Sequence, residues 1–429
     1  MKVAVIGAGW AGCAAAVEAA RLGHEVTVFE ASRVPGGRAR RVDARWQGKP
    51  ISLDNGQHIL IGAYSETLAL MSDLGVDGRA ALLRMPLTMR FPDGSGLALP
   101  RLPAPLDALV GIAGARGWSW HEKLSLLKLA LRWRLNRFSC GANDSVTDIC
   151  QGLAASIMSS FIEPLCVSAL NTPPARASGQ VFLRVMKDAI FSSSGGSNLL
   201  LPRIDLSALM PHAALAWLEK NGADIQRGVR VQRIEQLPGI KPGWVLQADL
   251  ADGANRFDAT VLACPPHEAA RLIESTGIAC EPWLDRARAL HHEAITTVYA
   301  FGAGASLSSP MLALRASEGQ PAQFVFDRAQ LGGPPGLLAF VVSASSGDSA
   351  SLGAQVLKQA AIQLGLANLE IAKTIVEKRA TFACAPGLQR PAMQVAPGLS
   401  ACGDYVDGPY PATLEGAVRS GLAAARQLD

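Results

Sequence analysis

The chain opens with Lys2-Val-Ala-Val-Ile-Gly-Ala-Gly-Trp-Ala-Gly12, a short apolar run that passes directly into three spaced glycines. An alanine-rich stretch of helical pattern follows, and a second apolar run occupies residues 25–29. A strand, a helix and a second strand in this order are typical of a β-α-β unit. The opening segment therefore predicts an α/β fold with a parallel sheet.

The three glycines have the spacing of a dinucleotide-binding turn. Gly7 would make the tight turn, Gly9 would let backbone N–H groups approach a pyrophosphate at the helix N-terminus, and Gly12 would let helix and strand pack closely. Glu30 follows Gly12 by 18 residues and ends the second strand, where a carboxylate can accept hydrogen bonds from a ribose. An Ala/Gly-rich turn could be purely structural, but strand, helix and acid together predict dinucleotide binding.

Length, composition and charge exclude several protein classes. The 429 residues are enough for two or three structural units, and 49% hydrophobic with 18% charged residues excludes a disordered chain. A net charge of +4 does not indicate nucleic-acid binding. The eight cysteines form no C-x-x-C pair, so we expect reduced, mostly buried thiols and no metal site. The N-terminus shows no secretion leader, which favours a cytoplasmic location.

The remaining pattern alternates between sheet and helix. Residues 100–190 have a helical pattern, and the uncharged stretch 294–314 contains Gly, Ser and Pro, which predicts buried strands and turns rather than a membrane span. Other predicted elements are an amphipathic helix at 206–218, strands at 244–250 and 256–263, antiparallel strands within 293–345, a helix at 350–365, a strand at 371–382, and a final strand, Gly-Asp turn and helix.

Two further motifs resemble those of the flavin amine oxidase and phytoene desaturase superfamily. The first is Pro35-Gly36-Gly37-Arg38, and the second is Ser400-Ala401-Cys402-Gly403-Asp404 with the segment from Thr413 to Ala417. Val231 matches a third position of the superfamily pattern. The resemblance implies non-covalently bound FAD.

The same resemblance implies a role for each matching residue. Arg38 would contact the FAD pyrophosphate, Asp404 would hold the ribitol chain, and Thr413 and Leu414 would place backbone groups beside the flavin ring. Gly37 and Gly403 would bind the cofactor as parts of the same two motifs. The backbone of Val231 would contact adenine. Taken singly, Arg38 could belong to a solvated basic loop, Asp404 could be a turn residue and Val231 could be core.

Three longer segments are similar to the hydroxysqualene dehydroxylases, also called squalene-associated FAD-dependent desaturases. These segments are residues 53–62, 161–174 and 261–270, and the similarity extends over essentially the whole chain. It implies a Rossmann-type FAD-binding domain built from residues 1–85, 205–282 and 385–429. It also implies a substrate domain, with a helical lid at 86–204 and an antiparallel sheet at 283–384.

The implied reaction is reduction of hydroxysqualene to squalene by flavin hydride, which needs one acid near the flavin and an apolar tunnel. His58 is the first candidate for the acid, but it could instead hydrogen-bond backbone or flavin carbonyl groups. Glu163 could be an acid of raised pKa in a dry site, or could cap or bridge helices. Asn171 and Tyr410 are candidate orienting groups.

Several alternatives stay open from the sequence. A carotenoid or phytoene-type desaturase would use the same motifs in the opposite electron direction, an amine or protoporphyrinogen oxidase would share the fold, and a prenyl-binding escort protein would keep the fingerprint without using flavin. A C30 isoprenoid substrate and an external electron donor for FAD are expected partners. We also expect a basic amphipathic face around residues 118–138 to contact anionic lipid on the cytoplasmic membrane face, or else to be a solvated face over core.

Overall fold

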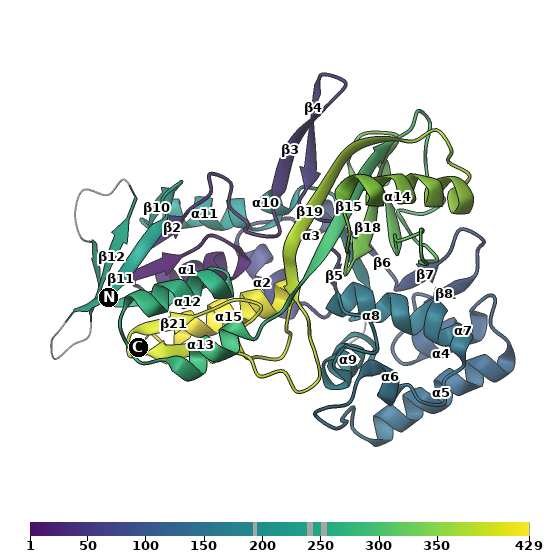
Figure 1. The fold of residues 1–429 in the computed structure, drawn as a ribbon, viewed down its shortest axis with the longest axis horizontal. Coiled ribbons are helices and arrows are strands. Elements are labelled where there is room, and N and C mark those ends of the chain that lie inside the picture. Colours follow the sequence, from purple (N-terminus) through teal and green to yellow (C-terminus); the bar gives the residue numbers. More distant parts are fainter. Residues whose placement is uncertain (192–194, 238–242, 250–254, 429) are drawn as a thin grey trace.

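The computed structural model describes residues 1–191, 195–237, 243–249 and 255–428. Figure 1 shows a parallel sheet with its covering helices at one end of the molecule. An antiparallel sheet and a block of helices share the other end. This arrangement confirms the predicted fold class.

The parallel sheet has the strand order β10-β2-β1-β14-β21-β20. Strands β1 (Lys2–Ile6) and β2 (Glu25–Glu30) form the predicted β-α-β unit with α1 (Trp10–Arg21). Their neighbours come from distant parts of the chain. These are β10 (Asp224–Arg227), β14 (Ala259–Leu262), β21 (Leu399–Ala401) and the antiparallel edge strand β20 (Gln394–Ala396). One sheet is therefore assembled from the start, the middle and the last part of the chain.

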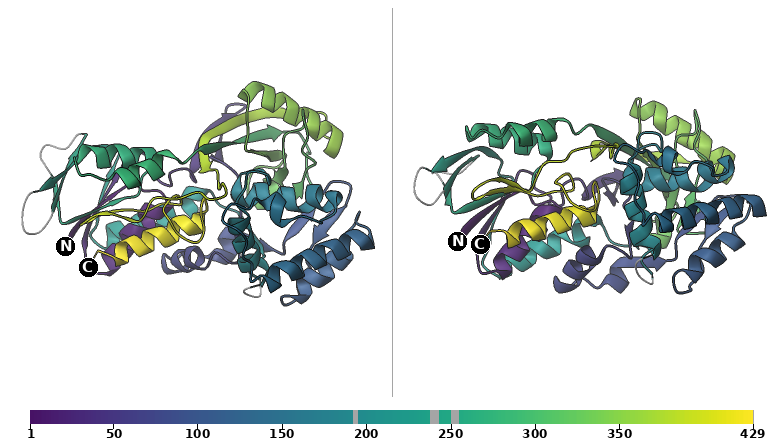
Figure 2. Two further views of the ribbon diagram at one scale, coloured as in Figure 1. Left: turned by 60° about the horizontal axis from the view of Figure 1, so that its bottom comes forward. Right: turned by 90° about the horizontal axis from the view of Figure 1, so that it is seen from below.

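Alternation along β1 gives the parallel sheet two buried faces. Val3 and Val5 pack with α1 in one hydrophobic cluster, whereas Ala4 and Ile6 belong to another cluster on the opposite side. Helices α1, α11 (Pro211–Lys220) and α15 (Leu414–Arg426) cover the first face. The second face carries α12 (Pro266–Ser275), α13 (Glu281–Arg288) and a small sheet of β11 (Val231–Leu237), β12 (Gly243–Ala248) and β13 (Asn255–Phe257), as Figure 2 shows.

Two predicted elements are divided in the structure. The strand expected at 256–263 breaks at Asp258, where the chain passes from the small antiparallel sheet into the parallel sheet. The Asp258 carboxylate accepts the Lys2 backbone N–H at 2.7 Å, and this bond marks the crossing. The helix expected at 206–218 is α10 (Leu206–Leu209) followed by α11, because Pro211 has no N–H to continue the first helix. In the strand predicted at 244–250, residue 250 lies outside the described residues.

The antiparallel sheet matches the prediction for residues 293–382. Its strand order is β16-β17-β18-β15-β19, and helix α14 (Ser349–Leu364) packs on it. The uncharged stretch 294–314 lies in two of these strands and the turns between them. Among the described residues, no helix has the length and apolar character needed to span a membrane. The strands are β15 (His292–Phe301), β16 (Met311–Ala313), β17 (Phe324–Asp327), β18 (Leu337–Ser343) and β19 (Glu370–Phe382).

Helices dominate residues 100–191, as predicted. The longest of them, α5 (Trp120–Leu135), begins at Ser119, which forms a reciprocal capping box with Glu122. The others are α4 (Leu106–Gly114), α6 (Val146–Ile149), α7 (Ala155–Ile157), η1 (Met158–Ile162), α8 (Glu163–Leu170), α9 (Gly179–Met186) and η2 (Lys187–Phe191).

Short elements connect the helical block to the two large sheets. A three-stranded sheet joins residues near 60, 84 and 200, so its strands come from both sides of the helical block. The predicted domain boundaries stay a prediction. The short elements are β3 (Arg41–Trp46), β4 (Lys49–Asp54), β5 (Leu60–Ile61), β6 (Leu82–Met85), β7 (Thr88–Arg90), β8 (Gly96–Ala98), β9 (Leu199–Pro202), α2 (Ser65–Asp73), α3 (Gly78–Ala81) and η3 (Ala329–Leu331).

Candidate active site

One cavity of about 810 Å³ runs from the carboxyl ends of the parallel strands to the antiparallel sheet and the helical block. It is the place where most of the predicted site residues meet. Among the residues predicted to bind the cofactor, those that line it are Gly7, Gly9, Glu30, Gly37, Arg38, Val231, Gly403, Asp404, Thr413 and Leu414. Gly12 lies outside the lining and packs within the protein.

The three glycines of the first turn have different surroundings. A Cβ on Gly7 would lie 2.6 Å from the Ala263 carbonyl oxygen, and the φ of Gly7 is +114°. A Cβ on Gly12 would lie 1.9 Å from the Gly7 carbonyl oxygen. A Cβ on Gly9, in contrast, would meet nothing closer than Gly37 Cα at 3.9 Å. Gly7 and Gly12 therefore serve the packing of strand and helix, whereas Gly9 leaves free space on the cavity side.

Helix α1 begins at the cavity without a side-chain cap. Its N-cap is Gly9, and no side chain accepts a hydrogen bond there from the first turn. Uncapped N–H groups and the helix dipole together favour an anion at this point. The N-terminus of α1 thus has the polarity that a pyrophosphate requires.

Glu30 stands at the end of β2 beside this helix N-terminus. Its Oε2 accepts the Ala8 N–H and its Oε1 accepts the Ser32 N–H, both at 2.7 Å. These bonds fix the carboxylate in one orientation at the cavity wall. Each carboxylate oxygen can accept a second hydrogen bond, so Glu30 keeps capacity for ligand hydroxyls.

Arg38 and Asp404 join the two motifs that lie furthest apart in the chain. Arg38 Nη2 forms an ion pair with Asp404 Oδ1, and Arg38 Nη1 donates to the Ala380 carbonyl oxygen at 2.8 Å. Burial alone would lower the pKa of Arg38, but the neighbouring Asp404 carboxylate raises it overall. Arg38 therefore remains a permanent cation in the cavity wall.

The N-terminus of the last helix, α15, also lines this end of the cavity. Thr413 caps α15, and its hydroxyl accepts the Gly416 N–H at 2.9 Å. Ser420, two helical turns after Thr413, accepts the Gly403 N–H at 3.0 Å and so fixes α15 to the end of β21. The N-terminus of α15 and the end of β21 thus reach the cavity as one unit.

Val231 also lines the cavity. Its side chain is buried, and its carbonyl oxygen accepts Arg271 Nη2 at 3.1 Å. Glu268 Oε2 in turn accepts the same Arg271 nitrogen at 3.1 Å. This network holds the start of β11 against α12 at the cavity wall.

These features together fit a dinucleotide. An uncapped helix N-terminus, a fixed carboxylate, a paired arginine and the N-terminus of a second helix all line one end of the cavity. Gly9 leaves space for backbone contact with a phosphate. The residues present therefore fit FAD.

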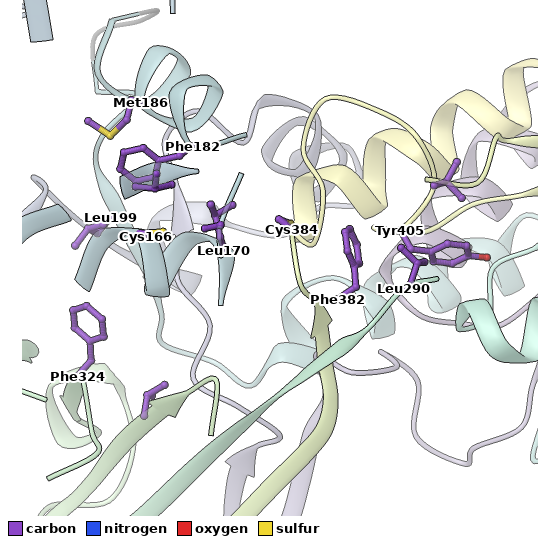
Figure 3. Packing of buried hydrophobic residues seen from close by; sticks show 14 of the residues in the cluster. Cys166, Leu170, Phe182, Met186, Leu199, Leu290, Phe324, Phe382, Cys384 and Tyr405 are labelled. Atoms are coloured by element: carbon purple, nitrogen blue, oxygen red, sulfur yellow. The ribbon is translucent and has the colours of Figure 1, made fainter. Parts of the chain in front are cut away.

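The other end of the cavity is lined mainly by apolar side chains. Most of them come from α8, α9, β9 and the antiparallel sheet, and the others from β5, η2 and the segments beside β5 and β7. Figure 3 shows three of them, Met186, Leu199 and Phe324, within the buried hydrophobic cluster. The apolar lining residues are Ile59, Ile61, Leu87, Leu165, Val167, Ala169, Val181, Val185, Met186, Ala189, Leu199, Ile295, Phe324, Phe326 and Val341.

His58 lies at the cavity wall next to the carbonyl oxygen of Gly56. Its Nδ1 is 2.9 Å from that oxygen, and because a carbonyl only accepts, Nδ1 carries the proton. Burial lowers the pKa of His58, the bond to Gly56 offsets part of this shift, and the Arg38 charge adds to it. The neutral ring therefore offers Nε2 as an acceptor, and only the charged ring has a second N–H to donate.

The structure does not bring Glu163 to the cavity. Glu163 is the first residue of α8, its side chain is exposed, and it is absent from the cavity lining. The expectation of a dry environment for this carboxyl is therefore wrong. The apolar neighbours in the sequence face inward, whereas Glu163 occupies the opposite side of the helix.

Asn171 and Tyr410 both line the cavity but have partners of their own. Asn171 ends α8 with a φ of +46°, and its Oδ1 accepts the Ala344 N–H at 2.7 Å while its Nδ2 donates to Thr381 Oγ1 at 3.0 Å. Asn171 therefore joins α8 to the antiparallel sheet. Tyr410 donates its hydroxyl proton to Asp188 Oδ2 at 2.8 Å.

Sequence reasoning missed a network of polar residues at the cavity wall and next to it. Arg328 is 6% exposed and its Nη1 donates to Gln57 Oε1 at 3.0 Å, so it fixes the amide of a cavity residue. Asn55 donates to Glu377 Oε2 at 2.7 Å and to the Arg38 carbonyl oxygen at 3.1 Å. The signal for Arg328 was its place directly after the apolar strand β17; Glu377, in an alternating strand, offered none.

Comparison with known proteins agrees with this geometry. Residues 10–363 match the model of the flavin containing amine oxidoreductases. The hydroxysqualene dehydroxylase of Rhodopseudomonas palustris is 27% identical over 99% of this chain and 97% of its own length. That of Sinorhizobium fredii is 25% identical over 63% of each chain. The resemblance found from the motifs is thus confirmed.

Solved structures give the same result at the level of the fold. An oxidoreductase from Methanosarcina mazei aligns over the full length of both chains with a TM-score of 0.72 and 19% sequence identity. The family match covers most of the chain, including the first turn from Trp10, Glu30 and Arg38. The chain therefore belongs to the flavin-containing amine oxidoreductases and is an FAD-dependent oxidoreductase.

Proposed function

We propose that this chain reduces hydroxysqualene to squalene. In this reaction the allylic carbon–oxygen bond breaks, a hydride forms the new carbon–hydrogen bond, and the oxygen takes up a proton and leaves as water. The name of the relative that matches over nearly its full length, a hydroxysqualene dehydroxylase, suggests the substrate class. The residues of the cavity supply the physical argument.

The observation that carries the proposal is the division of one cavity into two chemically different ends. One end offers a helix N-terminus, Glu30 and the Arg38–Asp404 pair, and the other end is a wall of aliphatic and aromatic side chains. A long hydrocarbon gains free energy by leaving water for such a wall. The carbon to be reduced can thus lie where the two ends meet.

FAD would be held by the first turn, Glu30, Arg38 and the N-terminus of α15, and in its reduced form it supplies the hydride. The apolar side chains exclude water from the reacting carbon, so a cationic carbon is protected from recapture by water. Asn171 keeps α8 against the antiparallel sheet and so keeps this wall closed.

The leaving hydroxyl needs a proton, and His58 is the residue that we propose to supply it. In the charged ring, Nδ1–H stays on the Gly56 carbonyl and Nε2–H becomes available to the substrate oxygen. Burial lowers the pKa of His58, which makes the charged ring a stronger acid but a less abundant one. Glu163 is not part of this proposal, because its side chain is exposed away from the cavity.

The test is a single turnover without oxygen. The flavin-loaded protein is reduced with dithionite, hydroxysqualene is added, and flavin absorbance and lipid product are followed together. We expect the flavin to be reoxidised with one equivalent of squalene formed. A flavin that stays reduced with hydroxysqualene, while the oxidised protein is bleached by a polyene precursor, would instead identify an isoprenoid desaturase. A protein that purifies without flavin would refute both.

A further inference from the structure

Exposed apolar side chains are concentrated in one short part of the chain. Of the fourteen large hydrophobic side chains that are exposed among the described residues, eight lie between residues 102 and 135. Scattered single exposures are ordinary, but a cluster of this kind marks a surface that contacts something other than water. The eight residues, which we call the α4–α5 face, are Leu102, Leu106, Leu109, Val110, Trp120, Leu124, Leu131 and Leu135.

The α5 part of this face forms a continuous stripe. Trp120, Leu124, Leu131 and Leu135 recur at intervals of one or two helical turns, and Trp120 and Leu135 are 69% and 73% exposed. The side of α5 that packs on the protein is a different one, formed by residues such as Leu126, Leu129 and Trp133. Because α5 packs on the protein through these other residues, its packing does not explain the exposed stripe.

Positive charge accompanies the stripe. Residues 101–138 contain seven arginines and lysines and two acids, a balance of +5, whereas the whole chain has +4. Both acids are occupied within the fold, since Asp107 is buried and Glu122 closes the α5 capping box. Lys128 and Arg134 are exposed on opposite flanks of the stripe. An apolar stripe with a cation on each flank has the chemistry of a helix that lies in the surface of an anionic membrane.

A hydrogen bond connects α5 to α4. Lys123 Nζ donates to the Ala113 carbonyl oxygen at 2.7 Å, and the same ammonium lies 4.8 Å from the centre of the Trp120 ring. On α4, Leu106, Leu109 and Val110 share one side of the helix and are exposed. Figures 1 and 2 show both helices at the end of the molecule remote from the parallel sheet.

We propose that the α4–α5 face docks on an anionic phospholipid bilayer, with its apolar side chains among the lipid headgroups and its cations on the phosphates. A second copy of this chain fits the face less well, because a twofold contact would place +5 against +5. A bilayer accepts both the apolar stripe and the charge. None of the residues from 101 to 138 lines the cavity, so the docking surface stands independently of the proposed reaction.

Vesicle sedimentation of the flavin-loaded protein tests the proposal. We expect binding to phosphatidylcholine vesicles that contain about one quarter phosphatidylglycerol, weaker binding to phosphatidylcholine alone, and a loss of the difference at high salt. A protein that stays in solution with both kinds of vesicle at low salt would overturn the proposal.

Matched variants test whether vesicle binding depends on the α4–α5 face or on exposed apolar side chains in general. The triple variant Leu124→Ser, Leu131→Ser and Leu135→Ser should lose roughly tenfold or more in vesicle affinity. Ile362→Ser is the control, because Ile362 is also exposed (59%) on a helix, α14, outside the α4–α5 face. Lys128→Gln with Arg134→Gln should weaken binding to the anionic vesicles only, and Lys358→Gln on α14 is its control.

Two results would contradict the proposal even if the protein binds vesicles. Undiminished binding of the triple variant would place the contact elsewhere on the surface. A dimer in light scattering that the triple variant abolishes would show that a second copy of the chain covers the face. Flavin content equal to that of the parent protein shows that each variant is folded, so loss of binding is not loss of structure.

Discussion

His58 illustrates how one hydrogen bond decides what a residue can do. With Nδ1–H on the Gly56 carbonyl, the ring donates to a ligand only when it is charged. Since the pKa of His58 is lowered, the charged form is already scarce at pH 7 and becomes scarcer as the pH rises. If His58 is the acid, the single-turnover rate should fall about tenfold per unit between pH 7 and pH 8.

The control for this prediction is His58→Gln. It should keep its flavin, lose about two orders of magnitude in rate and show no such pH dependence. A parent protein whose rate is constant from pH 7 to pH 8 would remove His58 as the acid and favour the orienting role of a neutral ring.

The glycines of the first turn also differ at the residue scale. Gly9→Ala adds a methyl group that the protein tolerates but that extends toward the cavity, whereas a methyl on Gly12 would meet the Gly7 carbonyl. We therefore expect Gly9→Ala to fold normally and bind FAD at least tenfold more weakly. Gly12→Ala should destabilise the apoprotein itself by about 1 to 3 kcal/mol. Flavin titration and thermal unfolding of both apoproteins distinguish the two effects, and equal unfolding temperatures would contradict this division.

Asp54 is a buried carboxyl outside the cavity lining. Its Oδ1 accepts the Leu206 N–H at 2.9 Å, its Oδ2 has no partner among the described residues, and burial raises its pKa to about 6. Because this value lies above the ordinary 3.8, Asp54 favours the folded state at low pH and this contribution is lost as the pH rises through about 6.

Replacing Asp54 with Asn removes that titration. From pH 4.5 to pH 7.5, the free energy of unfolding of Asp54→Asn should rise relative to the parent by about 2 kcal/mol. Urea unfolding at the two pH values measures this change. If the difference in unfolding free energy between the two proteins does not depend on pH, burial does not raise the pKa of Asp54.

At the scale of elements, the contact between α1 and α15 is set by a glycine. A Cβ on Gly421 would lie 2.2 Å from the Ala11 carbonyl oxygen, which is backbone and cannot turn aside. Gly421→Ala should therefore separate the two helices, lower the unfolding free energy by about 1 to 3 kcal/mol and weaken flavin retention, since Ala11 lines the cavity. Gly114→Ala on α4 is the control, because nothing lies within 4 Å of the added methyl. Equal losses in both variants would mean that helix contact is not the cause.

The helices and strands that could be predicted are those determined by residues close together in the sequence. The β-α-β unit, the long strand β19 and helix α14 depend on short-range pattern, and the structure has them where they were expected. The direction in which α5 faces was not predictable, because leucines occur on its buried and exposed sides alike and only the neighbouring helices choose between them. The prediction of a dry site for Glu163 was wrong for the same reason, because apolar neighbours in the sequence do not imply a buried side chain. The ion pair between Arg38 and Asp404 could not be predicted from the sequence, because only the complete fold brings these two distant residues together.

At the scale of the molecule, the cavity combines two ends that can be altered separately. Ala169 belongs to the apolar end and is remote in sequence from the first turn and from the Gly-Asp turn of β21. Ala169→Phe should occupy hydrocarbon space and reduce the rate with the long substrate by roughly tenfold or more, while flavin content and reduction by dithionite stay unchanged. Loss of flavin in this variant, or an unchanged rate, would show that the two ends are not divided as described.

The order of strands in the parallel sheet has a consequence for synthesis of the protein. On the ribosome, α1 emerges early and β14 follows in the middle of the chain, yet α15, which packs on α1, and β21, which pairs with β14, are made only after residue 398. Until then the edge of β14 that pairs with β21 is unpaired, and the side of α1 that packs on α15 is exposed. Arg38 also lacks its ion-pair partner, because Asp404 has not yet been made. Exposed edges and apolar helix faces are where nascent chains aggregate, so this chain must be shielded for most of its translation. Gly403, Asp404 and Thr413, which line the cavity, are likewise added only near the end of translation, so the cavity is complete only in the finished chain.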